Sequence, residues 1–225
     1  MKKLRTIFMG TPDFSVPCLK RLTEVAEVIA VVTQPDKPRG RGQKLSPSPV
    51  KAFALEHGLP VYQPARIKTP EFEQVLVDLQ PDLMVVVAFG QILSQRILDI
   101  PPYGCVNVHA SLLPRYRGAA PIHWSIIQGE TRTGVTTMFM DAGLDTGDML
   151  LKTEVEIGPE MVTEELHDAL MAAGATLLGQ TVEQIANGTI QREKQQDELS
   201  NYASLLTKET GHIDWSQSAA AIHNL

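Results

Sequence analysis

Cysteine is scarce in this sequence, and what little there is excludes several kinds of site. Cys18 and Cys105 stand in different predicted elements of a 225-residue chain and form no CxxC pair. This pattern favours buried thiols in a reducing compartment over a disulfide. Structural zinc sites normally use four paired ligands, so a site built from Cys105, His109 and a distant acid is the weaker alternative, and we expect no bound metal.

Long apolar runs are also missing. No stretch of the sequence reaches the ~18 consecutive apolar residues of a membrane span. The opening Met-Lys-Lys-Leu-Arg leads into a predicted strand instead of the apolar segment and cleavage site of a signal peptide. We therefore predict a cytoplasmic protein without a membrane partner.

Two common site motifs are absent as well. Gly10-Thr-Pro follows the first predicted strand, but it lacks the second and third glycines of a GxGxxG fingerprint and has a proline in the turn. This argues against a dinucleotide site. The sequence has no GxSxG elbow and no cysteine placed as a nucleophile, so a covalent enzyme intermediate is disfavoured.

Apolar runs and turn residues alternate in the order expected of an α/β fold. With 43% hydrophobic residues, the chain can bury a sizeable core. Strands are predicted at 4–9, 28–33, 59–62, 82–89, 106–109, 134–140 and 149–155, and helices at 14–25, 49–57, 71–79, 119–128 and 162–187. We predict a Rossmann-like α/β domain over residues 1–188, with a mostly parallel central sheet flanked by helices, and a linker region over residues 189–225.

Charge is distributed unevenly along the chain. The net charge is −6, but residues 1–68 carry twelve Lys and Arg against five Asp and Glu, and the remainder is acidic. The proline- and glycine-rich segment 34–49 has one acid and four basic residues, which are Lys37, Arg39, Arg41 and Lys44. This composition predicts a long exposed loop, which is either a finger that contacts nucleic-acid phosphates or a solvated surface without a partner.

Three polar side chains are predicted at strand ends. Val106 and Val108 alternate with Asn107 and His109, so the amide and the imidazole share one face of a strand, and Asp145 lies in a loop after another strand. An amide donor for an oxyanion, an imidazole that titrates near neutrality and a carboxylate that orients it would suit acyl transfer. Without a nucleophile, direct attack by an amine substrate is favoured. The alternatives are a turn-forming asparagine, a structural histidine and an aspartate cap.

Two longer motifs contain these residues and resemble a known family. Asn-x-His-x-Ser-Leu-Leu-Pro-x-x-x-Gly spans 107–118, and Asp-x-Gly-x-Asp-Thr-Gly spans 141–147. Both are similar to motifs of the formyltransferases that use 10-formyltetrahydrofolate. Shorter matches extend the resemblance over nearly the whole chain, at 10–14, 33–36, 40–42, 46–51, 117–122 and 213–216. The basic loop resembles the members of that family that act on methionyl-tRNA.

The resemblance implies a Rossmann-like formyltransferase domain that transfers a formyl group from 10-formyltetrahydrofolate to the α-amino group of methionyl-initiator tRNA, for translation initiation. Asn107 would hold the formyl oxygen, His109 would stabilise the tetrahedral oxyanion or manage the protons of the amine, and Asp145 would orient His109. The folate pocket would be lined by Ser111, Leu112, Leu113, Pro114, Phe89, Gly90, Ile92, Leu93, Asp141 and Leu144. The basic loop, with Arg41 as its best candidate, would bind the acceptor stem of the tRNA.

The same resemblance suggests further expectations and leaves two rivals. Family members carry a C-terminal β-barrel domain, and we expect this chain, acting as a monomer, to end where the connection to that domain begins. One rival function is formylation of a small amine such as an amino sugar nucleotide, against which the basic loop argues. The other is a folate- or RNA-binding protein without catalysis, against which Asn107, His109 and Asp145 argue.

Overall fold

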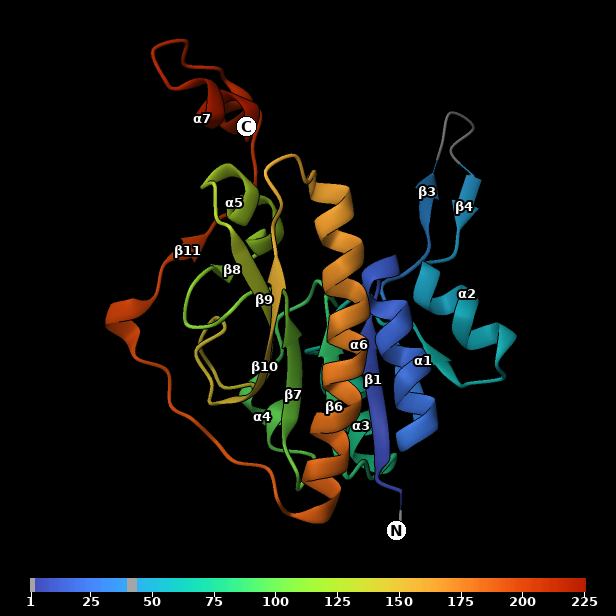
Figure 1. Ribbon diagram of the computed structural model, residues 1–225. Coiled ribbons are helices and arrows are strands. Elements are labelled where there is room, and N and C mark those ends of the chain that lie inside the picture. Colours follow the sequence, from blue (N-terminus) through green and yellow to red (C-terminus); the bar gives the residue numbers. More distant parts are fainter. Residues whose placement is uncertain (1–2, 40–43) are drawn as a thin grey trace.

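The chain folds around a seven-stranded central sheet with helices on both faces (Figure 1). The computed structural model describes residues 3–39 and 44–225. In spatial order the strands are β5 (Val61–Tyr62), β2 (Glu27–Val32), β1 (Arg5–Gly10), β6 (Leu83–Val87), β7 (Cys105–His109), β9 (Arg132–Phe139) and β10 (Met149–Glu156). The first five are parallel, whereas β9 is antiparallel to both of its neighbours. The predicted mostly parallel sheet of a Rossmann-like α/β fold is confirmed.

Local interactions explain where several of the helices begin or end. They are α1 (Val16–Val25), α2 (Pro49–Glu56), α3 (Pro70–Asp78), α4 (Gln95–Leu98), α5 (Pro121–Ile127), α6 (Thr163–Asn187) and α7 (Ala219–His223), with short 3₁₀ turns at Asp13–Ser15, Asp197–Leu199 and Glu209–Gly211. The hydroxyl oxygens of Ser48 and Thr69 accept hydrogen bonds from backbone N–H groups in the first turns of α2 and α3. Gly188 ends α6 with φ of 69°, a left-handed conformation that glycine adopts at little cost.

Two hydrophobic cores lie on opposite faces of the sheet. Side chains alternate along β1, so that Phe8 packs with α1 and α6 in one core while Ile7 and Met9 pack with α3 and α4 in the other. Every residue of Leu83–Val87 is buried, as expected for a central strand covered on both faces. Each large apolar side chain buried in this way contributes roughly 1.5–3 kcal/mol. The central strands therefore form a rigid base for the loops that leave them.

Segment 34–49 contains more structure than we predicted. Within this segment, β3 (Lys37–Arg39) and β4 (Lys44–Ser46) pair as an antiparallel hairpin that projects away from the central sheet (Figure 1). Lys37 pairs with Ser46 and Pro38 with Leu45, so two short extended segments satisfy each other's backbone groups. The prediction of a simple exposed loop was wrong in this respect. Helix α4 was likewise not predicted.

The segment after α6 returns across the molecule. Figure 1 shows it in orange to red, running outside β10 toward β8 (Arg117–Gly118). Glu193 forms an antiparallel bridge with Met149, and β11 (Tyr202–Ala203) pairs with β8 (Arg117–Gly118). Ala203 is fully buried in this pairing. Residues 193–203, here named the C-terminal strap, therefore pack against the first 188 residues. In the part of the chain that the structure describes, no helix combines the length and the apolar character needed to cross a membrane.

Candidate active site

Strand β7 presents Asn107 and His109 on one face. Val106 and Val108 belong to the core beneath α6, whereas Cys105 belongs to the opposite core. Because side chains alternate along a strand, Asn107 and His109 share the face of Cys105. His109 is buried, and Asn107 is partly exposed. The alternation expected from the sequence is therefore present in the fold.

Asp145 reaches the same point by an indirect route. Because β9 runs antiparallel to β7, the loop after Phe139 leaves the sheet near the beginning of β7, level with Val106. The loop then folds back over the sheet, and the Oδ2 atom of Asp145 accepts a hydrogen bond of 2.8 Å from the Gly118 N–H. Its Oδ1 atom accepts a longer bond of 3.4 Å from the Nδ2 atom of Asn107. The structure thus brings together the three side chains singled out from the sequence.

The surroundings of His109 distinguish its two ring nitrogens. Its Nε2 atom lies 2.9 Å from the carbonyl oxygen of Tyr116. A carbonyl can only accept, so Nε2 carries a hydrogen and donates it. The Nδ1 atom lies 3.7 Å from Oδ2 of Asp145, which is within ion-pair range but too far for a hydrogen bond. In a neutral ring the lone pair is therefore on Nδ1, and once Nδ1 takes a proton the carboxylate is close enough to stabilise the charge.

Tyr116 is itself firmly anchored. Its hydroxyl donates to Oε1 of Glu130 at 2.5 Å, and the same carboxylate pairs with Arg115. Burial, reinforced by the contact with Glu130, raises the pKa of Tyr116 to about 12, so the phenol stays neutral. The backbone of Tyr116 adopts a φ of 60°, which non-glycine residues rarely do. The side-chain contacts therefore help to keep the Tyr116 carbonyl directed at His109.

The two thiols are not suited to nucleophilic catalysis. Cys18 and Cys105 are both buried and free, and burial raises the pKa of each to about 12. Both remain protonated near neutral pH and are poor nucleophiles. Across residues 3–39 and 44–225, no three His, Cys, Asp or Glu side chains group in a way that could hold a metal ion.

The residues assigned to the folate by resemblance fall into two groups. Most of the apolar side chains are core residues: Phe89, Leu93 and Leu113 are 2%, 6% and 2% exposed. In contrast, Ile92 and Leu144 are 74% and 52% exposed, and Gly90 and Asp141 are also exposed. The buried residues can shape a pocket mainly through their backbone. The exposed residues present surface that a ligand can contact. Leu112 and Pro114 are partly buried.

The segment that follows β7 is held by polar contacts. Thr136 accepts a hydrogen bond from the Leu113 N–H at 3.1 Å and donates to the carbonyl of Ser111 at 2.7 Å. Ser111 is fully buried, and its hydroxyl donates to the carbonyl of Arg115. The peptide between Leu113 and Pro114 is cis. These contacts connect the motif that begins at Asn107 to strand β9.

Lys37, Arg39 and Lys44 lie in the β3–β4 hairpin, apart from strand β7, which carries Asn107 and His109 (Figure 1). Lys37 is exposed on β3, and the backbones of Arg39 and Lys44 pair with each other. Arg41 lies outside the described residues. At the base of the hairpin, Asp36 accepts hydrogen bonds of 2.7 Å from both Lys51 and Gln63. The hairpin is therefore anchored to α2 and to the segment after β5.

Several residues next to the site were not identified from the sequence. Gln195 and Asn201 of the C-terminal strap contact the loops that carry Asp145 and Tyr116, and Arg117 connects both regions. The strap is polar and far from these loops in the sequence, so no local pattern indicates the contacts. Only the pairing of β8 with β11 reveals them.

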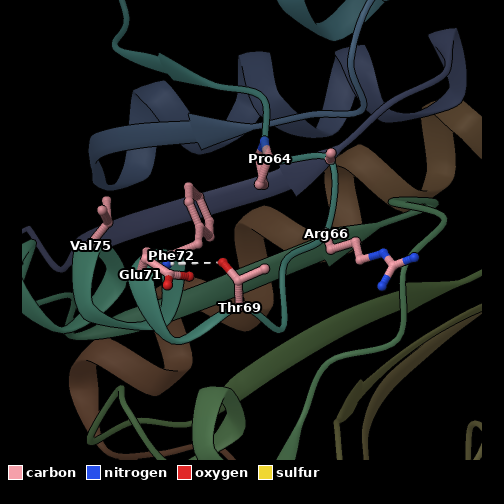
Figure 2. Close-up of a pocket in the computed structure, with 7 residues that line it drawn as sticks. Pro64, Arg66, Thr69, Glu71, Phe72 and Val75 are labelled. Carbon is pink, nitrogen blue, oxygen red and sulfur yellow. Dashed lines mark hydrogen bonds between the residues drawn. The ribbon is translucent and has the colours of Figure 1, made fainter.

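A groove of about 450 Å³ lies beside α3, and none of these residues lines it. Figure 2 shows Phe72 and Val75 on one side and Arg66 extending away from them, with the Thr69 side chain bonded to the backbone at Phe72. The side chain of Gln91 bonds to the backbone of Pro64 and Ile67 and so connects the groove wall to the loop after β6. None of the residues lining the groove was a candidate site residue.

The chain is similar to known proteins over most of its length. The model of the formyl transferase family matches residues 4–182. The methionyl-tRNA formyltransferase of Ruminiclostridium cellulolyticum is 59% identical over 223 residues, which cover 99% of this chain and 72% of that protein. The methionyl-tRNA formyltransferase of Geobacter metallireducens is 59% identical over 226 residues, covering 100% of this chain and 73% of the relative.

Solved structures share the fold at lower identity. An N-formyltransferase from Helicobacter canadensis, solved with folinic acid and dTDP-3-aminofucose, gives a TM-score of 0.75 at 21% identity, covering 98% of this chain and 78% of the other. A phosphoribosylglycinamide formyltransferase from Bacillus halodurans gives 0.68 at 22% identity, covering 80% and 94%. With the family match and the close relatives, these likenesses show that the chain belongs to the formyl transferase family, within the group of methionyl-tRNA formyltransferases.

Proposed function

We propose that the chain transfers the formyl group of 10-formyltetrahydrofolate to the α-amino group of methionyl-initiator tRNA, as a monomer in the cytoplasm, and so prepares the tRNA for translation initiation. The observation that carries the proposal is the meeting of Asn107, His109 and Asp145 in a chain that is 59% identical to methionyl-tRNA formyltransferases. The family alone could accommodate other amines. The identity to the tRNA enzymes and the basic hairpin favour methionyl-tRNA as the acceptor.

Asn107 supplies the hydrogen-bond donor for the formyl oxygen. Its Nδ2 atom already bonds to Asp145, which fixes the orientation of the amide and leaves the second N–H available. A donor held in place before the reaction stabilises the negative charge that develops on an oxygen under attack. No rearrangement of Asn107 is required.

His109 would take a proton from the amine as it attacks the formyl carbon, and would return a proton to the folate nitrogen as the bond between that nitrogen and the formyl carbon breaks. Its Nε2–H is committed to the carbonyl of Tyr116, so Nδ1 is the nitrogen that can take a proton. The resulting imidazolium would lie beside the carboxylate of Asp145, 3.7 Å away. Asp145 thus performs two tasks, because it faces the charge on His109 and orients the amide of Asn107.

The formyl donor would bind between the loops that border these side chains. The folate supplies the formyl group, and its ring would contact the exposed backbone at Gly90 and the exposed apolar surfaces of Ile92 and Leu144. The segment from Ser111 to Pro114 continues directly from β7 and would border the other side. A mixture of apolar side chains and backbone polar groups fits an aromatic heterocycle with ring nitrogens.

The basic hairpin would contact the phosphates of the tRNA. Lys37 is exposed there, and Arg39, Arg41 and Lys44 lie on the same segment. Arg41→Ala is expected to weaken the use of methionyl-tRNA while leaving folate binding unchanged. Equal weakening of folate binding would contradict the division into a donor site and a tRNA hairpin.

The decisive assay is formyl transfer to methionyl-initiator tRNA by the 225-residue chain, with binding of each substrate measured in parallel. Turnover that requires both the tRNA and 10-formyltetrahydrofolate supports the proposal. Absence of turnover despite binding of both substrates would refute it. Faster formylation of an amino sugar nucleotide would identify the rival acceptor class.

A further inference from the structure

Two backbone positions next to His109 have unusual conformations. Asp145 has a φ of 53° and Tyr116 a φ of 60°, and they are two of the four non-glycine residues with positive φ among the described residues. Such conformations cost roughly 1–3 kcal/mol and persist only where the surroundings hold them in place. Asp145 and Tyr116 are also the residues that flank the two ring nitrogens of His109.

Gln195 of the C-terminal strap holds the first position. Its Nε2 atom donates to the carbonyls of Asp145 and Gly147, each at 2.8 Å. Its Oε1 atom accepts a bond of 2.9 Å from Nε of Arg117. The side-chain amide thus uses both of its hydrogens and one of its acceptor positions. It ties the loop of Asp145 to strand β8.

Asn201 holds the second position. Its Oδ1 atom accepts a hydrogen bond from the N–H of Tyr116, and its carbonyl accepts one of 3.0 Å from the N–H of Arg117. The peptide unit that leads into Tyr116 is therefore fixed immediately before the carbonyl that receives the hydrogen of His109. Pairing of β11 with β8 keeps Asn201 in register for this contact.

We infer that Gln195 and Asn201 are positioning residues of the site, which hold Asp145 and Tyr116 in left-handed conformations and thereby fix both groups that flank His109. This inference rests on the proposed function. It also places two determinants of the site outside residues 4–182, the part of the chain that the formyl transferase family model matches.

The chemistry of the two contacts predicts opposite responses to conservative substitution. Gln195 acts on Asp145 as a donor, so Gln195→Glu, which has the same size but no donor in its ionised form, should fail like Gln195→Ala. Asn201 acts on Tyr116 as an acceptor, so Asn201→Asp should retain function where Asn201→Ala does not. Gln196→Ala is the matched control, because this neighbouring side chain is exposed.

The first measurement is the kinetics of formyl transfer by the full chain and these variants. We expect Gln195→Ala, Gln195→Glu and Asn201→Ala to lower kcat roughly 10- to 100-fold, as for a displaced catalytic group. KM for both substrates should change little, and Asn201→Asp and Gln196→Ala should resemble the parent. A kcat near the parent's for both alanine variants, or an equal loss in Gln196→Ala, would overturn the inference.

A second measurement does not need turnover. Long-range ¹H–¹⁵N NMR spectra report which nitrogen of His109 carries the hydrogen, with the signal assigned by its loss in His109→Gln. We expect an Nε2–H ring in the parent and in Gln196→Ala, and altered ring signals in Gln195→Ala and Asn201→Ala. If the parent transfers no formyl group, the proposed function fails, while unchanged His109 signals in both alanine variants would refute the positioning roles.

Discussion

Replacing Asp145 by asparagine removes the charge of the site while keeping its shape. The carboxylate accepts from Gly118 on one oxygen and from Asn107 on the other, and the side chain is only 12% exposed. An asparagine has one oxygen, so its NH₂ group must face one of these donors. An unpaired buried donor costs about 1–3 kcal/mol of folding stability. In addition, the carboxylate beside Nδ1 of His109 is lost.

We expect Asp145→Asn to lower kcat by ~10²-fold or more, equivalent to about 2.7 kcal/mol of transition-state stabilisation. Steady-state formyl transfer measures kcat, and urea unfolding measures the cost in stability. Asp148→Asn is the control, since Asp148 lies in the same loop but takes no part in these side-chain contacts. A kcat for Asp145→Asn within about threefold of the parent would refute the roles assigned to the carboxylate.

Two further predictions concern the support of the site. At Gly147 a Cβ atom would lie 1.7 Å from the carbonyl oxygen of Phe139. Gly147→Ala should therefore lower the free energy of unfolding by at least ~1–3 kcal/mol. An unchanged midpoint of urea unfolding would contradict this close approach. Burial raises the pKa of Glu130, but hydrogen bonds from Tyr116 and Arg115 outweigh this effect and hold the pKa below its usual 4.5. The ionised carboxylate therefore stabilises the fold above pH 4.5. This contribution is lost as the pH falls through the lowered pKa. Thermal unfolding from pH 3 to 6 should therefore show that the Tm of the parent exceeds that of Glu130→Gln near pH 6 and that this difference shrinks toward pH 3. A Tm difference that stays constant over this range would disprove the lowered pKa of Glu130.

Local patterns were sufficient to predict the elements that carry the site. The alternation of Val106 and Val108 with two polar residues places both polar side chains on one face of a strand, because the side-chain period is two. The end of α6 at Gly188 was equally predictable, since glycine adopts the left-handed C-terminal conformation. In both cases the information lies within a few residues of the feature.

Features that depend on long-range contacts were not predictable in this way. The hairpin in segment 34–49 forms because two three-residue segments pair, although its prolines and glycines are typical of an irregular loop. Tyr116 has a left-handed conformation, and its N–H donates a hydrogen bond to Asn201, which is 85 residues away in the sequence. Bulky residues rarely adopt positive φ, so no local rule indicates it.

The antiparallel course of β9 explains why the site depends on the strap. A loop that followed a parallel strand would emerge beside the end of β7, near His109. Here the loop starts level with Val106 and must fold back over the sheet to reach Asn107. Along that path Asp145 adopts a left-handed conformation, which costs free energy, and the backbone of Gly147 closely approaches Phe139. Gln195 contacts the carbonyls of both residues from another part of the chain, and these hydrogen bonds offset that cost.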